Sequence, residues 1–266
     1  MKYLIFYLHY IMTSKLLLFS LIASTSYATA ADGSLKEKAL ALYTSNKNSV
    51  LYLSAVVEVE LTAGDSPSKK EERKVEMIGT VIGKDGLIVV PLSTLDVAST
   101  IDGRTINSAQ GPVKISAKGT TKEVKILMPD GTEVAAKVAF KDTDLDLAFI
   151  RPEQPDAVKL TPVDTANSAP MAILDDVIVL GRLGKDLNRE ALVMTGEVVS
   201  MVTKPRTFAK IGTPSLGMPV FNGEGKFLGI GINHSSPKGD SESQGPSPSG
   251  VVLPASDLLE SSAQAK

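Results

Sequence analysis

Runs of alternating apolar and polar residues, separated by glycine-containing turns, make up most of the chain after residue 48. Residues 49–61 (SVLYLSAVVEVEL) are rich in β-branched side chains and predict a first strand. Three hairpins follow, which span residues 77–90, 124–140 and 219–232. Their turns contain Asp-Gly or Asn-Gly, which supply the positive φ that a tight turn needs. Short strands at this spacing predict an all-β barrel or sandwich rather than βαβ units.

The segments outside these strands have patterns of their own. Residues 35–43 carry apolar side chains at helical spacing and predict one short amphipathic helix. Residues 69–74 (KKEERK) are predicted to form a charged, solvated turn. Residues 100–121 contain few large apolar side chains and are predicted to form a surface loop. Residues 235–249 (SSPKGDSESQGPSPS) offer nothing apolar to bury, so we expect an exposed loop there.

The first 30 residues read as a secretory signal peptide. A short apolar run, residues 16–22, follows Lys15 and precedes Ala28-Thr29-Ala30, a cleavage site of small residues. The run is too short for the roughly 20 apolar residues that span a bilayer, so we expect cleavage near Ala30 and no stable membrane anchor. The start codon is Met1 or Met12, and Met12 gives the more conventional charged region.

The composition of the chain limits which cellular compartments and which binding partners can be expected. The chain has no cysteine, which excludes a disulfide framework and a catalytic thiolate. Export without disulfides fits a bacterial periplasm or secretion. Removal of residues 1–30 takes away Lys2 and Lys15, which leaves 26 basic and 30 acidic residues and a net charge near −4. This balance gives no electrostatic reason to expect a nucleic-acid partner. About 236 mature residues are compatible with one all-β domain.

The order of the segments resembles the protease domain of the HtrA/Deg branch of trypsin-like serine proteases. Residues 79–90 are similar to its Gly-x-Gly hairpin ending in Ile-Val-Thr, and residues 144–150 to its Thr-Asp-Leu-Ala-Val-Leu strand. Residues 195–200 (TGEVVS) are similar to Thr-x-Gly-Ile-Val-Ser, and residues 250–258 to the strand-to-helix passage that closes the second barrel. No single piece is specific, but their collinear order covers most of the mature chain.

The resemblance implies a trypsin-like double β-barrel with short N-terminal and C-terminal helices. We therefore expect a lead-in with a helix at residues 31–48 and a two-barrel domain at residues 49–266. Each barrel is expected to have six strands, the first in about residues 49–155 and the second in about residues 165–260. The active site of this family lies in the cleft between the barrels, and we expect no PDZ domain in this chain.

The same resemblance locates the catalytic positions, and most carry the wrong residue. The family's Gly-Asn-Ser-Gly-Gly-Pro-Leu is set on residues 214–220, so Leu216 stands at the nucleophile and Pro214 at an oxyanion-hole glycine. Proline has no N–H to donate to an oxyanion. The family's histidine falls on Ser93, which cannot act as a base near neutral pH. Only the aspartate is kept, at Asp146.

Other residues offer partial substitutes for the lost groups. A shift of one residue would make Ser215 an alternative nucleophile. His234 is the one histidine after residue 30, and it follows the nucleophile position instead of lying in the first barrel, so we interpret it as structural. Lys204 and Lys210 are the lysines closest before Ser215 for a Ser-Lys dyad, but no pattern places either amine beside a hydroxyl.

Two further patterns suggest ligands and are interpreted as structural. Asp142, Asp144, Asp146 and Glu153 have the spacing of four calcium ligands in an EF-hand loop, but the glycine required at position 6 is Leu147. Residues 181–184 (GRLG) lack the lysine and helix start of a phosphate-binding loop and are expected to form a barrel corner. We expect no metal and no cofactor.

These observations favour an exported pseudoprotease that binds extended peptide or unfolded protein segments in its cleft. An alternative is an active serine endopeptidase with a non-standard catalytic arrangement. Another is a structural envelope protein whose cleft is filled by its own side chains, such as Leu216 and Met218. The sequence does not indicate an oligomeric state.

Overall fold

The computed structural model describes residues 34–108, 111–234 and 249–265. The predicted signal peptide (residues 1–30) and all but the last residue of the predicted loop at residues 235–249 lie outside these ranges. Residues 35–266 group as one compact unit. Within the described part of the chain, no helix has both the length and the apolar character needed to cross a membrane.

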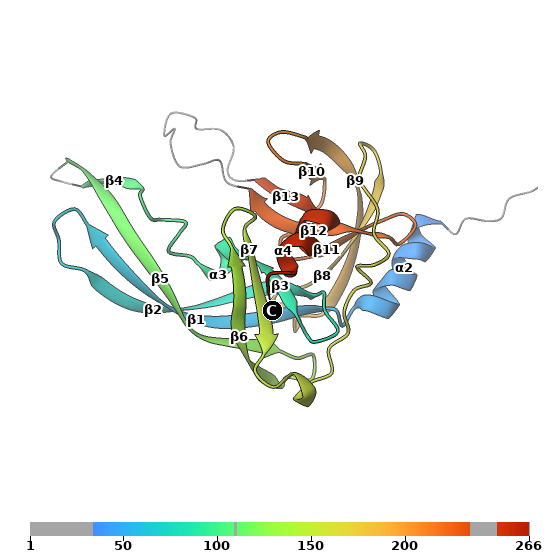
Figure 1. The fold of residues 1–266 in the computed structure, drawn as a ribbon, viewed down its shortest axis with the longest axis horizontal. Helices are drawn as coiled ribbons and strands as arrows, with labels where there is room; N and C mark the ends of the chain where they lie inside the picture. The colour runs from blue at the N-terminus through green and yellow to red at the C-terminus, as the bar shows by residue number, and fades with distance from the viewer. Residues whose placement is uncertain (1–33, 109–110, 235–248, 266) are drawn as a thin grey trace, which may run out of the picture. The chain divides into compact units, whose positions relative to one another are not determined.

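Six antiparallel strands close the first barrel (Figure 1). Neighbouring strands pair in the order β1-β2-β3-β7-β6-β5, and β5 pairs back with β1 to complete the circle. The bounds of the strands are β1 Val50–Ala63, β2 Lys69–Val81, β3 Ile88–Pro91, β5 Gly111–Leu127, β6 Glu133–Asp142 and β7 Leu147–Pro152. A further strand, β4 (Thr105–Ser108), pairs only with β5.

The strands β1, β2 and β5 continue beyond the barrel as a long ribbon, which reaches to the left in Figure 1. The predicted charged turn at residues 69–74 is therefore wrong, because these residues pair with residues 56–61 of β1. Ion pairs across the strands hold the charged side chains in the sheet, for example Lys70 with Glu58 at 3.3 Å. Lys70 and Glu58 are diagonal neighbours on the two strands, and opposite charges in such positions stabilise antiparallel pairing without a turn.

The predicted surface loop at residues 100–121 is also wrong. Residues 105–108 form β4 and residues 111–121 belong to β5, which extends β1 on its second edge. Ala117 on β5 and Val57 and Val59 on β1 are buried under the segment that contains Ala98. Small side chains suffice to fill this thin layer, so the segment lacks the large apolar residues by which a strand is usually identified.

The second barrel is closed by six strands in the order β10-β13-β12-β11-β8-β9. Their bounds are β8 Asp176–Arg182, β9 Ala191–Val202, β10 Phe208–Ile211, β11 Pro219–Asn222, β12 Phe227–His234 and β13 Ser249–Pro254. The two closed antiparallel barrels confirm the predicted trypsin-like double barrel. All three predicted hairpins form, as β2–β3, β5–β6 and β11–β12, with Gly86, Gly131 and Gly225 at positive φ in their turns.

Within the described ranges, three short α-helices accompany the barrels: α2 (Leu35–Asn46), α3 (Leu92–Leu95) and α4 (Ala255–Ser262). Two single turns of 3₁₀-helix, η1 (Pro155–Ala157) and η2 (Lys185–Leu187), lie in connections. The N-terminal and C-terminal helices expected from the sequence are thus present as α2 and α4.

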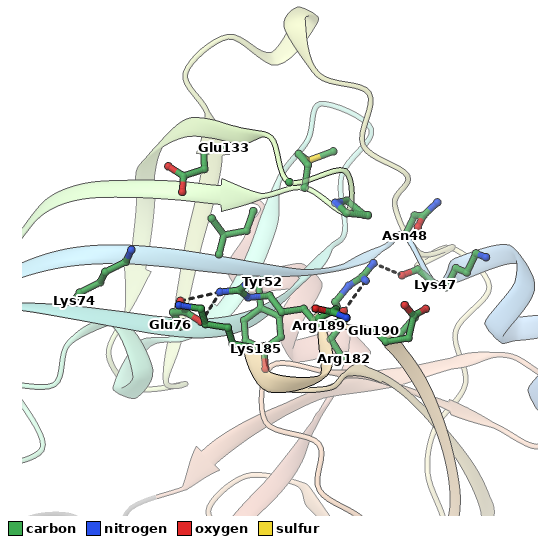
Figure 2. Close-up of a pocket in the computed structure, with 16 residues that line it drawn as sticks. Lys47, Asn48, Tyr52, Lys74, Glu76, Glu133, Arg182, Lys185, Arg189 and Glu190 are labelled. Atoms are coloured by element: carbon green, nitrogen blue, oxygen red, sulfur yellow. Dashed lines mark hydrogen bonds and ion pairs between the residues drawn. The ribbon is translucent and has the colours of Figure 1, made fainter.

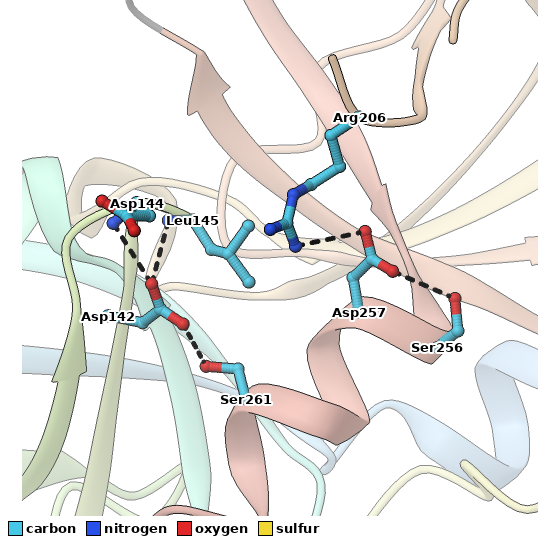
Figure 3. A network of polar contacts seen from close by, with 7 residues as sticks. All are labelled: Asp142, Asp144, Leu145, Arg206, Ser256, Asp257 and Ser261. Carbon is cyan, nitrogen blue, oxygen red and sulfur yellow. Dashed lines mark hydrogen bonds and ion pairs between the residues drawn. The ribbon is translucent and has the colours of Figure 1, made fainter. Parts of the chain in front are cut away.

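The helix α4 is fastened to the first barrel by polar contacts, some of which Figure 3 shows. The buried hydroxyl of Ser261 donates a hydrogen bond of 2.7 Å to Oδ2 of Asp142, which closes β6. Arg151 donates another to the carbonyl of Ala265, which follows the helix. Because α4 continues directly from β13 of the second barrel, these bonds connect the two barrels.

Three apolar clusters make up the core. One fills the first barrel and one fills the second. A third contains residues from both barrels, such as Phe149 on β7 and Phe227 on β12, and joins them. Alternation along the strands produces this arrangement: Ile88 and Val90 face into the first barrel while Val89 faces the second. Strands buried on both faces read as continuous apolar runs in the sequence.

Candidate functional site

Asp146 lies in the turn between β6 and β7, at the junction of the two barrels. Its φ is +56°, a left-handed conformation that aspartate tolerates better than most residues. Its carbonyl accepts a hydrogen bond of 2.8 Å from the N–H of Leu92, the first residue of α3. The backbone bond and the turn together fix the direction of the carboxylate.

Three donors surround the carboxylate of Asp146. The N–H of Ser93 donates to Oδ1 at 2.6 Å, and the hydroxyl of Ser93 donates to Oδ2 at 3.0 Å. The N–H of Asn233, on β12 of the second barrel, donates to Oδ2 at 2.8 Å. The structure therefore brings Ser93 and Asp146 together, as the alignment to a catalytic base and its orienting aspartate predicts. The hydroxyl of Ser93 is a side-chain partner of Asp146.

Burial raises the pKa of the Asp146 carboxyl above its usual value. The hydrogen bonds from Asn233 and Ser93 act in the opposite direction, because they favour the ionised form, but desolvation is the larger effect. The carboxylate lies between strands of both barrels with limited access to water. Its charge is stabilised by dipoles only, since its partners are two backbone N–H groups and one hydroxyl.

The loop before β11 carries the residues aligned to the nucleophile. Pro214 is exposed, Ser215 is only 6% exposed, and the side chain of Leu216 is 39% exposed. Leu216 forms a parallel bridge with Gly231 of β12. The backbone of Ser215 lies directly on Gly231, where an added Cβ would be 1.9 Å from the Ser215 carbonyl oxygen. Ser215 is thus packed against a strand, and the residues on either side of it, Pro214 and Leu216, are exposed.

Gly217 fits a narrow space between the barrels. Its φ is +74°, and a Cβ at this position would be 2.1 Å from the carbonyl oxygen of Ile78 on β2. The hydroxyl of Thr80, also on β2, donates a buried hydrogen bond of 2.9 Å to the Gly217 carbonyl. Only glycine can take this conformation so close to a neighbouring backbone. The first barrel therefore supports the loop that the second barrel presents.

The strand β12 contacts both the loop before β11 and Asp146. Gly231 contacts Leu216, and Asn233, two residues further along the same strand, binds Asp146. Two residues of a strand span roughly 7 Å, which separates the residue of β12 that contacts Leu216 from the one that binds Asp146. Ser93 and Asp146 are in direct contact, while Leu216 shares with Asp146 only the neighbouring strand β12.

Met218 lies elsewhere. It is buried in the core of the second barrel, with its sulfur next to Gly181. The hypothesis that both Leu216 and Met218 fill the cleft therefore does not hold for Met218. The segment at residues 181–184 follows β8 into the connection to β9, and Gly181 gives room for this methionine.

The other candidate bases have different roles. His234 is exposed at the end of β12, and its ring centroid lies 4.5 Å from that of Phe208. The amine of Lys210 donates to the carbonyl of Gly250 at 2.8 Å, a contact within the second barrel. Both contacts are structural, and neither directs a basic nitrogen to Ser215.

The aspartates at residues 142–146 form a turn. Oδ1 of Asp142 accepts hydrogen bonds of 3.1 Å from the N–H groups of Asp144 and Leu145, and Oδ2 accepts the hydroxyl of Ser261 (Figure 3). Both oxygens of Asp142 are thereby used within the fold. Among the described residues, no group of three or more histidine, cysteine, aspartate or glutamate side chains is placed to hold a metal ion.

Two contributors to the site could not be identified from the sequence. Asn233 acts through its backbone N–H, which every residue except proline offers, so its side chain gives no signal. Thr80 acts across the barrels, 137 residues before Gly217. The pattern of the β2–β3 hairpin predicts only that Thr80 belongs to a strand.

Residues 78–230 match the family model of the trypsin-like peptidase domain. This match includes the whole segment between β2 and β12 and contains Ser93, Asp146 and Leu216. No curated protein sequence matches the chain.

Many solved structures are similar to this chain, and two of them illustrate the likeness. The MamO protease domain from Magnetospirillum magneticum, in its apo form, is 16% identical with a TM-score of 0.49, over 82% of this chain and 97% of that chain. The HtrA-type protease AlgW, in a variant solved with a tripeptide, is 13% identical with a TM-score of 0.52, over 84% of this chain and 61% of that chain. At these identities the likeness to AlgW concerns the fold alone.

Proposed function

The chain belongs to the trypsin-like peptidase domain family, and from this premise we propose that it is a pseudoprotease. It binds extended peptide or unfolded protein segments in the cleft between its barrels and does not hydrolyse them. The observation that carries the proposal is the set of hydrogen bonds around Asp146. Its carboxylate binds the N–H and the hydroxyl of Ser93, so the group that orients a base in a serine protease has a serine as its partner.

The nucleophile loop supports the same conclusion. A serine protease needs a reactive hydroxyl, a base within hydrogen-bond reach and N–H donors directed at the oxyanion. Leu216 and its neighbour Pro214 are exposed in this loop, and neither side chain has a nucleophilic atom. Ser215 is buried against Gly231, and Pro214 has no N–H. An active endopeptidase with a non-standard arrangement would have to expose Ser215 and supply a base from elsewhere.

Binding an extended peptide by strand addition, without hydrolysis, requires an unpaired strand edge. The first barrel offers one. The strand β2 pairs with β1 from Lys69 to Thr80, but with β3 only at Thr80 and Val81. Within the described ranges, the second edge of β2 from residue 69 to residue 79 has no strand partner. An extended segment added to such an edge gains backbone hydrogen bonds, and this mode of recognition needs no nucleophile.

We further propose that the protein acts after export, in the periplasm or outside the cell, once the signal peptide has been removed near Ala30. The support is the apolar run followed by small residues, together with the absence of cysteine from the sequence. Mass spectrometry of the N-terminus of the protein secreted from its host would test this. A mature chain that begins at Ala31 is expected, and a retained Met1 or Met12 would contradict the proposal.

Peptide binding and peptide cleavage should be measured in one experiment. The protein from residue 31 onward is incubated with a fluorescein-labelled library of unstructured decapeptides, bound peptides are recovered, and all peptides are analysed by mass spectrometry. We expect a subset of peptides to be bound and every peptide to remain intact. New peptide ends that depend on Ser215 would support the active endopeptidase instead. An absence of binding across the library would favour the structural envelope protein.

A further inference from the structure

A pocket of about 490 Å³ lies between the first barrel and the connection from β8 to β9 (Figure 2). Its volume is in the range of pockets that bind organic ligands and much larger than one inorganic ion needs. The lining comes from the α2–β1 connection, β1, β2, the β5–β6 hairpin and residues 182–191. Ser93, Asp146 and Leu216 do not line it, so it is separate from the site described above.

Positive charge dominates the lining. Five basic residues face three glutamates. The basic residues are Lys47, Lys74, Arg182, Lys185 and Arg189, and the glutamates are Glu76, Glu133 and Glu190. Two of the glutamates are already paired: Glu76 binds Arg189 with both oxygens, at 2.9 and 3.0 Å, and Glu133 binds Lys125 outside the pocket at 3.1 Å.

The arginines are held in place by the fold. The guanidinium of Arg182 donates to three backbone carbonyls, those of Val50, Lys47 and Arg189. Burial lowers the pKa of Arg182, and the negative charge of Glu190 opposes that shift. Carbonyl groups satisfy the hydrogen bonds of a guanidinium without cancelling its charge, so Arg182 leaves positive charge behind one wall of the pocket.

Arg189 is fixed on the same wall. It stands over the ring of Tyr52 at 5.4 Å, and its φ of +52° is uncommon for a residue with a Cβ. Its Nε is buried and has no hydrogen-bond partner among the described residues. The exposed residues Lys74 and Lys185 line the pocket together with the Glu76–Arg189 pair (Figure 2).

The strand β2 contacts both the pocket and the nucleophile loop. Lys74 and Glu76 are two residues apart and both line the pocket, so alternate residues of β2 face it. Two residues beyond Glu76, the carbonyl of Ile78 lies against Gly217 of the nucleophile loop. A segment that pairs with the free edge of β2 would therefore leave the cleft with every second side chain on the pocket side.

We propose that this pocket receives an acidic side chain of the bound segment, so that the protein selects acidic peptides. The inference rests on the proposed function and adds its preferred ligand. The carboxylate lies between Lys74 and Lys185, within the field of Arg182. Leu127, Met128 and Pro129 provide an apolar wall for the methylene groups of a glutamate. Complementary charge of this kind chiefly determines which partner binds and how fast.

The test compares two fluorescein-labelled decapeptides by fluorescence anisotropy, one in which valine alternates with glutamate and one in which valine alternates with glutamine. We expect the acidic peptide to bind the native protein at least about tenfold more tightly at low salt, with the difference decreasing as salt is added. Lys74→Glu combined with Lys185→Glu should abolish this preference for the acidic peptide.

The matched control is Lys137→Glu with Lys159→Glu, which reverses two exposed charges outside the pocket. It should retain the preference for the acidic peptide. Equal binding of both peptides to the native protein would overturn the acidic preference and leave the proposed function standing. Equal losses in the two double variants would also overturn it, because net charge and not the pocket would then be responsible. Failure of both peptides, together with the decapeptide library, would remove the proposed function itself.

Discussion

At the scale of single residues, Asp146 has a structural role at the junction of the two barrels. Its carboxylate joins α3 of the first barrel to β12 of the second through Ser93 and Asn233. A buried carboxylate without these donors would be costly, since an unsatisfied charged group loses its hydration without compensation. The residue therefore has a role in the fold that does not depend on a nucleophile.

The first prediction concerns Ser93→Ala, which removes one donor to this carboxylate. The pKa of Asp146 is raised in the folded protein, so the folded state binds the proton more tightly than the unfolded state. The contribution of Asp146 to stability is thus fully present below its usual pKa near 3.8 and is lost as pH rises through the folded value. Loss of a bond to the ionised form raises this folded pKa further.

We therefore expect Ser93→Ala to lower the free energy of unfolding by about 1–2 kcal/mol at pH 7 and by less at pH 4. Urea unfolding at both pH values measures the difference. Ser66→Ala, at an exposed serine of the β1–β2 turn, is the control and should have no effect at either pH. A loss for Ser93→Ala that is equal at both pH values would show that the hydroxyl does not act through the charge of Asp146.

The second prediction concerns Gly217→Ala. A methyl group there would meet the Ile78 carbonyl at 2.1 Å and would also oppose a φ of +74°. We expect a loss of roughly 3–5 kcal/mol, because the strain of the backbone adds to the collision. Gly131→Ala has a similar φ of +86° and open space around it, so it isolates the conformational cost, which is about 1–2 kcal/mol. Similar losses for both variants in urea unfolding would mean that the loop moves away from β2.

The sequence predicts those residues of this site that lie in segments similar to the protease family. Ser93, Asp146 and Leu216 are predicted because they fall within collinear segments, and the structure shows a direct contact between Ser93 and Asp146. The sequence does not predict the role of Asn233, because this residue contributes a backbone group. Nor does it predict the burial of Ser215, which depends on packing against Gly231. Backbone contacts between distant segments have no signature in a single sequence.

At the scale of elements, helix α4 connects the two barrels. Ser261 is 2% exposed, and its hydroxyl is the partner of Oδ2 of Asp142. The third prediction is that Ser261→Ala lowers the free energy of unfolding by about 1–2 kcal/mol, since it leaves this carboxylate oxygen without its donor. Ser256→Ala changes an exposed hydroxyl of the same helix and should stay within about 0.5 kcal/mol of the native protein. Equal effects of the two variants in urea unfolding would contradict this role.

Some strands and turns can be predicted from the sequence, and others cannot. Turns and hairpins were predicted correctly where glycine and aspartate mark a tight change of direction, as at Gly86 and Gly131. The ribbon was missed because residues 69–74 are all charged and residues 100–121 are mostly small or polar. In both cases pairing with β1 determines the strand conformation. Tertiary pairing overrides local preference most easily in strands.

At the scale of the whole molecule, the two barrels share one core, and we expect them to unfold together. Phe149 is completely buried in the cluster that contains residues of both barrels. The fourth prediction is that Phe149→Ala costs about 3–5 kcal/mol and that unfolding remains a single transition. Leu187→Ala, at a residue that is 58% exposed, is the control and should cost less than about 0.5 kcal/mol.

Hydrogen exchange reports on the stability of each barrel separately in the Phe149→Ala variant. Amides of β1 in the first barrel and of β12 in the second should lose protection by the same amount in Phe149→Ala, because one cooperative unit contains both strands. If β1 became less protected while β12 kept its native protection, the barrels would be independent. The cleft would then be a junction between two domains and not part of one rigid frame.

The central claim is that the trypsin-like cleft is kept and the chemistry is lost. Fluorophosphonate labelling tests it most directly, because the probe reacts with an activated serine whatever peptide the protein prefers. The native protein is compared with Ser215→Ala and with a variant that carries Ser93→His, Pro214→Gly and Leu216→Ser. We predict no labelling of the native protein and labelling of the triple variant. Labelling of the native protein that disappears in Ser215→Ala would contradict the claim and establish an active serine protease.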